Sequence, residues 1–297
     1  MARPPSRRPQ RSSRGGSPQR RANSRAPLGP PKGKVSGSKR APTSSLELPA
    51  KGLRQVIGLH SVREVFQVRP RSVKRLWLRA GWETSQDLAE LGQRAQQMGI
   101  PMEVTSVEQL ERLGSGHQGL CVAVSESPLL DWDQVKGAEK MLLLALDGVE
   151  DPHNLGAILR TSWLMGVAGV IIPEMRSVGL TPTVAKVACG GAEHVPLEVE
   201  TNLAAVLERL REAGFWIFGL EASDSSRQLW DLELPDKVVW VLGSEEKGLR
   251  SPVRRACDEG VQIPQLEARA SYNVSVACAM ALAETLRQWN LSKNIGK

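Results

Sequence analysis

Short, almost uninterrupted apolar runs recur in the second half of the chain, and segments with helical periodicity separate them. The clearest runs lie at 141–146, 169–172, 216–220 and 238–242. A strand that is apolar on both faces has to be covered on both faces, as in a parallel sheet flanked by helices. The alternation therefore predicts an α/β fold with a mostly parallel sheet.

The helices expected between these strands have recognisable start signals. Asn154 can cap a helix that runs to about Gly166, and Thr181-Pro182 suits a start with proline in the first turn. The other expected elements are a helix over 203–213, a short helix after Ser251-Pro252, a brief strand at 261–263 and a long helix over 274–289. This pattern predicts one α/β domain over 140–297.

A smaller alternating pattern occupies residues 52–127. Residues 54–68 have apolar positions at helical spacing, and His60-Ser61 lies near the expected start of that helix. The remaining expected elements are strands at 74–78, 101–105 and 120–124 and helices at 85–98 and 107–113. This region is expected to be a small α/β domain, joined to the larger one by a linker at 128–139.

The first 51 residues have a different composition. Residues 1–50 contain twelve Lys or Arg, one acidic residue, Glu47, nine Pro and nine Ser. Such a segment cannot bury enough apolar surface to offset the entropy of ordering, so 1–51 is predicted to be a disordered tail. Its arginine clusters favour nonspecific binding to RNA. A solubility tail and a mitochondrial transit peptide stay open as alternatives, although the prolines spoil the amphipathic helix of a transit peptide.

The composition also argues against several classes of protein. No apolar stretch approaches the roughly 18 residues of a membrane helix, and no apolar run follows the basic N-terminus as in a secretory signal. The four cysteines include no C-x-x-C pair, so we expect buried thiols, a reducing, cytoplasmic compartment and no metal site. No G-x-G-x-x-G follows the strand at 141–146 and no G-K-[ST] occurs, which disfavours nicotinamide, flavin and nucleoside-triphosphate chemistry.

Polar, glycine-containing segments follow three strands of the larger domain. We call them the first segment (147–161), the second segment (243–250) and the third segment (263–276). The carboxyl ends of parallel strands meet at one edge of a sheet, where open α/β folds bind their ligands. Glycines in the first two segments let a ligand approach bare backbone. The three segments are therefore expected to form the site together.

The same segments carry the motifs of a known family, the SpoU RNA 2′-O-ribose methyltransferases of the SPOUT superfamily. In order and spacing, motifs one, two and three of this family resemble Asn154-x-Gly156-x-x-x-Arg160-Thr161, Gly243-x-Glu245-x-x-Gly248 and Ser271-x-Asn273-Val274-Ser275-Val276-Ala277. Residues 52–127, through 57–64 and 117–119, also resemble the ribosomal-protein-related substrate-binding domain of the members that act on 23S rRNA.

The resemblance implies a trefoil-knotted, Rossmann-like catalytic domain, an obligate homodimer and S-adenosyl-L-methionine bound in a bent conformation. By similarity, Gly243, Ile263 and Tyr272 line the cofactor pocket, largely through backbone groups. The family usually has leucine where this chain has Tyr272. Because the backbone makes the family's contact there, we expect cofactor binding to survive this departure.

By the same resemblance, Arg160 is the proposed base. An arginine pKa above about 12 leaves almost none of the side chain deprotonated at neutral pH. A guanidinium that grips the phosphate of the target and stabilises the forming alkoxide is an alternative role. In either role we expect Arg160 to be essential. Arg250, just after the second motif, is a candidate for contact with RNA phosphate.

The other candidate catalytic residues are polar side chains of the same motifs. Asn154 is expected to orient Arg160, with helix capping as its structural alternative. Glu245 is expected to hold Arg160 or a ribose hydroxyl. Ser271 and Asn273 are expected to combine hydrogen bonding in the site with the start of the last helix.

Together these features predict an S-adenosyl-L-methionine-dependent enzyme that methylates a ribose 2′-hydroxyl in RNA, foremost a guanosine of 23S rRNA, free or in a ribosome assembly intermediate. Within the enzyme class, tRNA and an rRNA adenosine stay open as targets, and the small domain favours rRNA. From another class, the alternative is an RNA-binding assembly factor without catalysis. The intact candidate catalytic residues weigh against that alternative.

Overall fold

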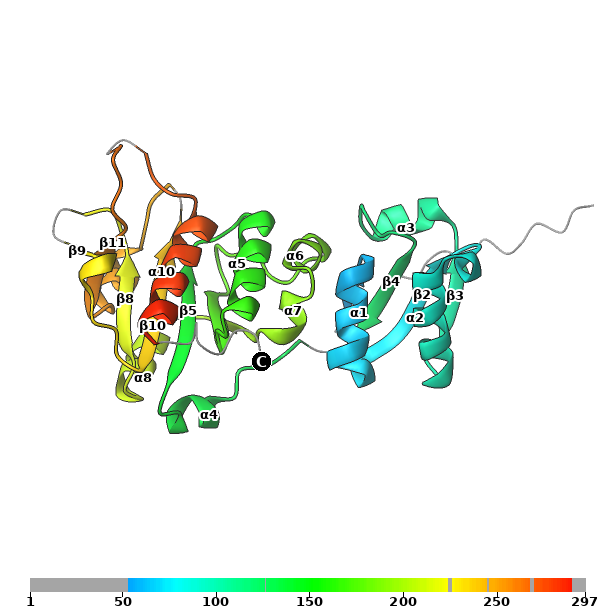
Figure 1. The fold of residues 1–297 in the computed structure, drawn as a ribbon, viewed down its shortest axis with the longest axis horizontal. Helices are drawn as coiled ribbons and strands as arrows, with labels where there is room; N and C mark the ends of the chain where they lie inside the picture. The colour runs from blue at the N-terminus through cyan, green and yellow to red at the C-terminus, as the bar shows by residue number, and fades with distance from the viewer. Residues whose placement is uncertain (1–52, 126, 224–225, 245, 268–269, 290–297) are drawn as a thin grey trace, which may run out of the picture. The chain divides into compact units, whose positions relative to one another are not determined.

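The computed structural model describes residues 53–125, 127–223, 226–244, 246–267 and 270–289, and within them seven parallel strands form one sheet (Figure 1). The sheet order is β7-β6-β5-β10-β8-β11-β9. In that order the strands are Leu197–Glu200, Gly169–Pro173, Met141–Asp147, Lys237–Gly243, Trp216–Leu220, Glu259–Gln262 and Arg227–Gln228. The predicted parallel sheet is confirmed, whereas the predicted tail at 1–51 lies outside the described residues.

Helices cover both faces of this sheet, because successive side chains of a strand point to opposite faces. Leu142, Leu144 and Leu146 of β5 pack on one face, and Leu143 and Ala145 pack on the other. The first face is covered by α5 (Pro152–Leu164), α6 (Pro182–Ala188), α7 (Gly191–His194) and α10 (Val274–Gln288). The second face is covered by α4 (Trp132–Gly137), α8 (Leu203–Glu212) and α9 (Ser251–Arg255).

Residues 53–125 contain a four-stranded mixed sheet in the order β1-β4-β2-β3. In that order its strands are Arg54–Ile57, Leu120–Val124, Val73–Arg79 and Met102–Thr105. Strand β4 runs antiparallel to both of its neighbours, and β2 and β3 run parallel. Helices α1 (Leu59–Val68) and α2 (Gln86–Gln97) cover one face, and α3 (Val107–Leu113) covers the other. Single 3-10 turns occur at Pro70–Ser72, Trp82–Thr84 and Leu229–Asp231.

Several local features differ from the prediction. Residues 54–57 are a strand paired with β4 rather than the start of a helix, and α1 begins at Leu59, beside His60-Ser61 as expected. The predicted linker at 128–139 contains the short helix α4, whose N-cap Asp131 accepts hydrogen bonds from two backbone amides. Strands β7 and β9 and helix α7 were not predicted from the sequence. Among the described residues, no helix combines the length and the apolar character needed to cross a membrane.

A buried carboxylate ties β1 to α7 within the compact unit Ser45–Lys297. Glu193 is 1% exposed, and its two oxygens accept hydrogen bonds from Nη1 and Nη2 of Arg54 at 2.8 and 2.7 Å. Nη2 of Arg69 donates to the same carboxylate at 3.2 Å. A carboxylate pays a large desolvation cost on burial, and two guanidinium partners offset it.

Candidate functional site

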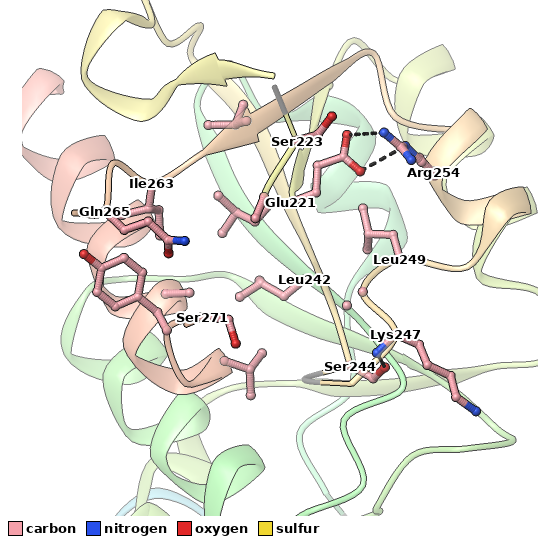
Figure 2. Close-up of a pocket in the computed structure, with 18 residues that line it drawn as sticks. Glu221, Ser223, Leu242, Ser244, Lys247, Leu249, Arg254, Ile263, Gln265 and Ser271 are labelled. Carbon is pink, nitrogen blue, oxygen red and sulfur yellow. Dashed lines mark hydrogen bonds and ion pairs between the residues drawn. The ribbon is translucent and has the colours of Figure 1, made fainter. Parts of the chain in front are cut away.

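Two adjoining cavities open at the carboxyl edge of the parallel sheet. The first cavity has a volume of about 500 Å³ and lies among the ends of β8, β10 and β11, the second segment and the start of α10 (Figure 2). The second cavity has a volume of about 450 Å³ and lies between the first and second segments. These two segments emerge side by side because the sheet register pairs Asp147 with Gly243. Both cavities are lined by Ser244, Lys247, Gly248 and Val274.

Gly243 ends β10 where the second segment folds back against it. A Cβ on Gly243 would lie 2.2 Å from the carbonyl carbon of Gly248 and 2.5 Å from the amide nitrogen of Leu249. Ser244 and Gly248 exchange backbone hydrogen bonds of 3.2 and 2.9 Å, and Gly248 has a φ of +63°. Because no side chain fits at Gly243, this residue presents bare backbone to the first cavity.

Ile263, Ser271 and Tyr272 line the same cavity from the third segment. The Tyr272 hydroxyl donates a hydrogen bond to the carbonyl oxygen of Pro264 at 3.1 Å, which fastens the start of α10 to the end of β11. The apolar walls come from Leu220, Leu242, Leu249, Val261 and Ile263. The structure therefore brings the three predicted cofactor residues to one cavity, which has apolar walls and exposed backbone.

A hydrogen bond between Asn154 and Asn273 joins the first and third segments. Nδ2 of Asn273 donates to Oδ1 of Asn154 at 2.9 Å, and Oδ1 of Asn273 caps α10 by accepting from the amide of Ser275. Asn154 is 7% exposed and lines the second cavity. It does not cap α5, because the Asp151 carboxylate accepts from the amide of His153 and takes that role. The alternative role predicted for Asn154, capping of α5, is thus wrong.

The structure does not place Arg160 at either cavity. Arg160 is exposed on α5, more than one turn after Asn154, and belongs to the lining of neither cavity. Its backbone packs tightly against α7, since a Cβ on Gly191 would lie 2.9 Å from the Cα of Arg160. Glu245 lies outside the described residues, and its exposed neighbour Glu246 lines the second cavity.

Sequence reasoning missed two carboxylates at the carboxyl ends of buried strands. Asp147 is 1% exposed and accepts hydrogen bonds from Nε of Arg250 at 2.6 Å and from its backbone amide at 2.8 Å. Arg250 therefore fastens the second segment to β5, and it also lines the second cavity. Glu221 follows β8, lines the first cavity and pairs with Arg254 (Figure 2). A charged residue directly after a buried apolar run could have indicated both carboxylates. A charged group at such a position is partly buried and therefore needs a partner.

Three of the cysteines are poor nucleophiles. Burial raises the pKa of the Cys121, Cys257 and Cys278 thiols to about 12, so almost no thiolate is present at neutral pH. Within the described ranges, no group of three or more His, Cys, Asp or Glu side chains is arranged to hold a metal ion.

The sequence matches two family models. Residues 141–283 match the SpoU rRNA Methylase family, and residues 55–130 match the RNA 2′-O ribose methyltransferase substrate binding family. The protein is 41% identical over 244 residues to the 23S rRNA (guanosine-2′-O-)-methyltransferase RlmB of Pseudomonas aeruginosa, covering 79% of this chain and 96% of the relative. It is 40% identical over 240 residues to RlmB of Neisseria meningitidis, covering 79% and 95%.

Solved structures share the fold. The SpoU methyltransferase AviRb from Streptomyces viridochromogenes, in complex with AdoMet, has a TM-score of 0.72 and 22% identity, with 80% of this chain and 91% of that chain covered. An RNA 2′-O ribose methyltransferase structure has a TM-score of 0.64 and 22% identity, with 81% and 90% covered. The arrangement of the described elements is thus the one found in these methyltransferases.

Proposed function

The chain belongs to the SpoU rRNA methylase family, and on that premise we propose that it transfers a methyl group from S-adenosyl-L-methionine to the ribose 2′-hydroxyl of a guanosine in 23S rRNA. Relatives that match over nearly their whole length are named for this reaction. The observation that carries the proposal is the Asn154–Asn273 hydrogen bond, because it joins two family motifs beside two adjoining cavities.

The first cavity suits the cofactor. Ligand pockets usually measure about 300–1,000 Å³ and combine apolar walls with a few polar groups, which describes this cavity well. Gly243 would hold the cofactor through its backbone, Ile263 would add an apolar wall, and Tyr272 would close the side formed by the third segment. When bound, S-adenosyl-L-methionine supplies a methyl group that its sulfonium already activates.

The second cavity is proposed to receive the target nucleotide. Asn154 lines it, and the hydrogen bond from Asn273 fixes which way the Asn154 amide faces. Ser271 lines the first cavity. The second cavity is lined by the carboxylates of Glu150, Asp151 and Glu246 as well as by Arg176 and Lys247, and these two cations would bind the phosphates that flank the ribose. The protein's role in this scheme is to orient the ribose rather than to supply a covalent nucleophile.

Arg160 is proposed to bind a phosphate of the target rather than to act as a base, because a guanidinium stays protonated at neutral pH. Arg160 does not line the cavities of its own chain, and we propose that a second copy brings it to the site in a homodimer. Helices α5 and α10 lie side by side (Figure 1), and each leaves a large apolar side chain exposed: Leu164 is 69% and Val276 44% exposed. A second copy that packs on these helices would cover both side chains.

The remaining parts of the chain take supporting roles in the proposal. Residues 52–127 would be the RNA substrate-binding domain, in line with the family match at 55–130, and 128–139 the linker. Residues 140–297 would be the knotted catalytic domain, and 1–51 a nonspecific RNA-binding tail. Glu245, in the second motif, would hold Arg160 or a ribose hydroxyl. The enzyme would act in the cytoplasm, where ribosomes are assembled.

The proposal is tested with purified protein, labelled S-adenosyl-L-methionine and total RNA from cells that lack the gene. We expect label in large-subunit rRNA, recovered after digestion as 2′-O-methylguanosine. Label in tRNA, or on adenosine, would agree with methylation of a ribose 2′-hydroxyl but would refute a guanosine of 23S rRNA as the substrate. RNA binding without any label, also on assembly intermediates, would refute methylation and favour an assembly factor.

A further inference from the structure

The carboxylate of Glu221 is built into the wall of the first cavity. Nε and Nη2 of Arg254 lie 2.9 Å from its two oxygens (Figure 2), and the Ser226 hydroxyl donates to Oε1 at 3.3 Å. The backbone amide of Glu221 donates to the carbonyl oxygen of Val261 on β11 at 2.9 Å. The position of the carboxylate is thus fixed by its own strand, by β11 and by α9.

The neighbouring strand leaves room for this carboxylate. A Cβ on Gly260 would lie 2.6 Å from Oε1 of Glu221 and 2.9 Å from the Ser226 hydroxyl oxygen. Gly260 pairs with Gly219 in the sheet, directly beside the end of β8. A glycine at this place therefore allows the carboxylate to lie against β11 and to face the cavity.

Glu221 also has hydrogen-bonding capacity beyond these contacts. An ionised carboxylate offers about four acceptor sites, and the contacts with Arg254 and Ser226 use three of them. Its side chain is 16% exposed, so it is neither sealed off nor freely solvated. Among the described residues that line the first cavity, Glu221 is the sole carboxylate, and its neighbours include the apolar Leu220 and Val261.

An ionised carboxylate with a remaining acceptor site binds groups that donate a hydrogen bond, such as the hydroxyls of a ribose. In dinucleotide-binding folds, a carboxylate beside the sheet accepts hydrogen bonds from ribose hydroxyls. We propose that the remaining acceptor site of Glu221 takes a hydrogen bond from the 2′- or the 3′-hydroxyl of the cofactor's adenosine ribose, and that Arg254 is the residue that positions the carboxylate. This inference rests on the proposed function, since it assigns the first cavity to S-adenosyl-L-methionine.

Calorimetric titration of the whole protein with S-adenosylhomocysteine tests the proposal without turnover. The wild type should bind the 2′-deoxy form or the 3′-deoxy form of this ligand about tenfold or more weakly, because a hydrogen bond to a charged group is lost. Glu221→Ala should bind S-adenosylhomocysteine with a similar loss and should no longer discriminate against the deoxy forms. Arg254→Gln should reduce the same discrimination, a ratio that general destabilisation would not change.

Glu259→Ala is the matched control. Glu259 is a carboxylate on β11 that pairs with Arg227 at 3.2 Å and does not line the first cavity. This variant should retain wild-type affinity and wild-type discrimination. If Glu221→Ala is unstable, Glu221→Gln keeps the size of the side chain and should show a smaller loss in the same direction.

Two results would overturn the inference while leaving the proposed function intact. One is equal binding of S-adenosylhomocysteine and its deoxy forms by the wild type. The other is full discrimination by Glu221→Ala. Failure of the wild type to bind S-adenosylhomocysteine at all would instead refute the cofactor assignment, and the inference would fall with it.

Discussion

Replacing Gly243 by alanine should distort the wall of the first cavity, because the added methyl group has no room. The new Cβ would lie 2.2 Å from the carbonyl carbon of Gly248, whereas ordinary contact begins at 3.4 Å. The second segment would have to move by about 1.2 Å, and it is backbone, not a flexible side chain, that must move. Overpacking of this kind costs roughly 1–3 kcal/mol, and a misplacement near 1 Å costs on the order of a hundredfold in rate.

The assay measures S-adenosylhomocysteine affinity by calorimetry, thermal unfolding and methyl transfer side by side. We expect Gly243→Ala to stay folded, to bind the ligand at least tenfold more weakly and to lose about a hundredfold in turnover. Gly179→Ala is the matched control, because Gly179 has no heavy atom within 4 Å of an added Cβ and should behave as wild type. Wild-type affinity in Gly243→Ala would refute the role given to bare backbone at the end of β10.

Three further changes test other parts of the account. Glu193→Ala removes the carboxylate that pairs with the guanidinium groups of Arg54 and Arg69. It should lower the free energy of unfolding, measured in urea, by about 3–5 kcal/mol. A loss under 1 kcal/mol would contradict the stabilising role given to this buried ion pair. Arg160→Ala should abolish methylation while S-adenosylhomocysteine affinity stays within twofold, and normal turnover would remove Arg160 from the site. Deletion of 1–50 should weaken RNA binding uniformly and flatten its salt dependence, because twelve basic residues are lost; methylation of a different nucleotide would refute the nonspecific role of the tail.

Much of the fold follows from local patterns. The run at 141–146 is a buried strand because its residues supply both faces of the sheet, and α6 starts with Thr181 as N-cap and Pro182 at the first position. Residues 54–57 were predicted to share the helical spacing of 54–68, because their apolar positions fit helical spacing as well as strand pairing. Pairing with β4, a strand more than 60 residues away, decided the outcome.

The position of the site could be predicted from the sequence, whereas the contacts between its residues mostly could not. The three segments could be placed at one sheet edge because the carboxyl ends of parallel strands meet there. The cap of α5 was misassigned, since Asp151 before Pro152 competes for that role with Asn154. The contacts Asn154–Asn273 and Asp147–Arg250 each span more than 100 residues, and local periodicity carries no information about them.

The central claim is that this chain places a 2′-O-methyl group on one guanosine of 23S rRNA. Mass spectrometry of 23S rRNA digests from cells without the gene, complemented with wild type, Asn154→Ala or Arg160→Ala, tests it most directly. The account predicts that one 2′-O-methylguanosine disappears on deletion and returns with the wild type, that Asn154→Ala restores it poorly, and that Arg160→Ala does not restore it. An unchanged 23S rRNA methylation pattern in the deletion strain would contradict the claim.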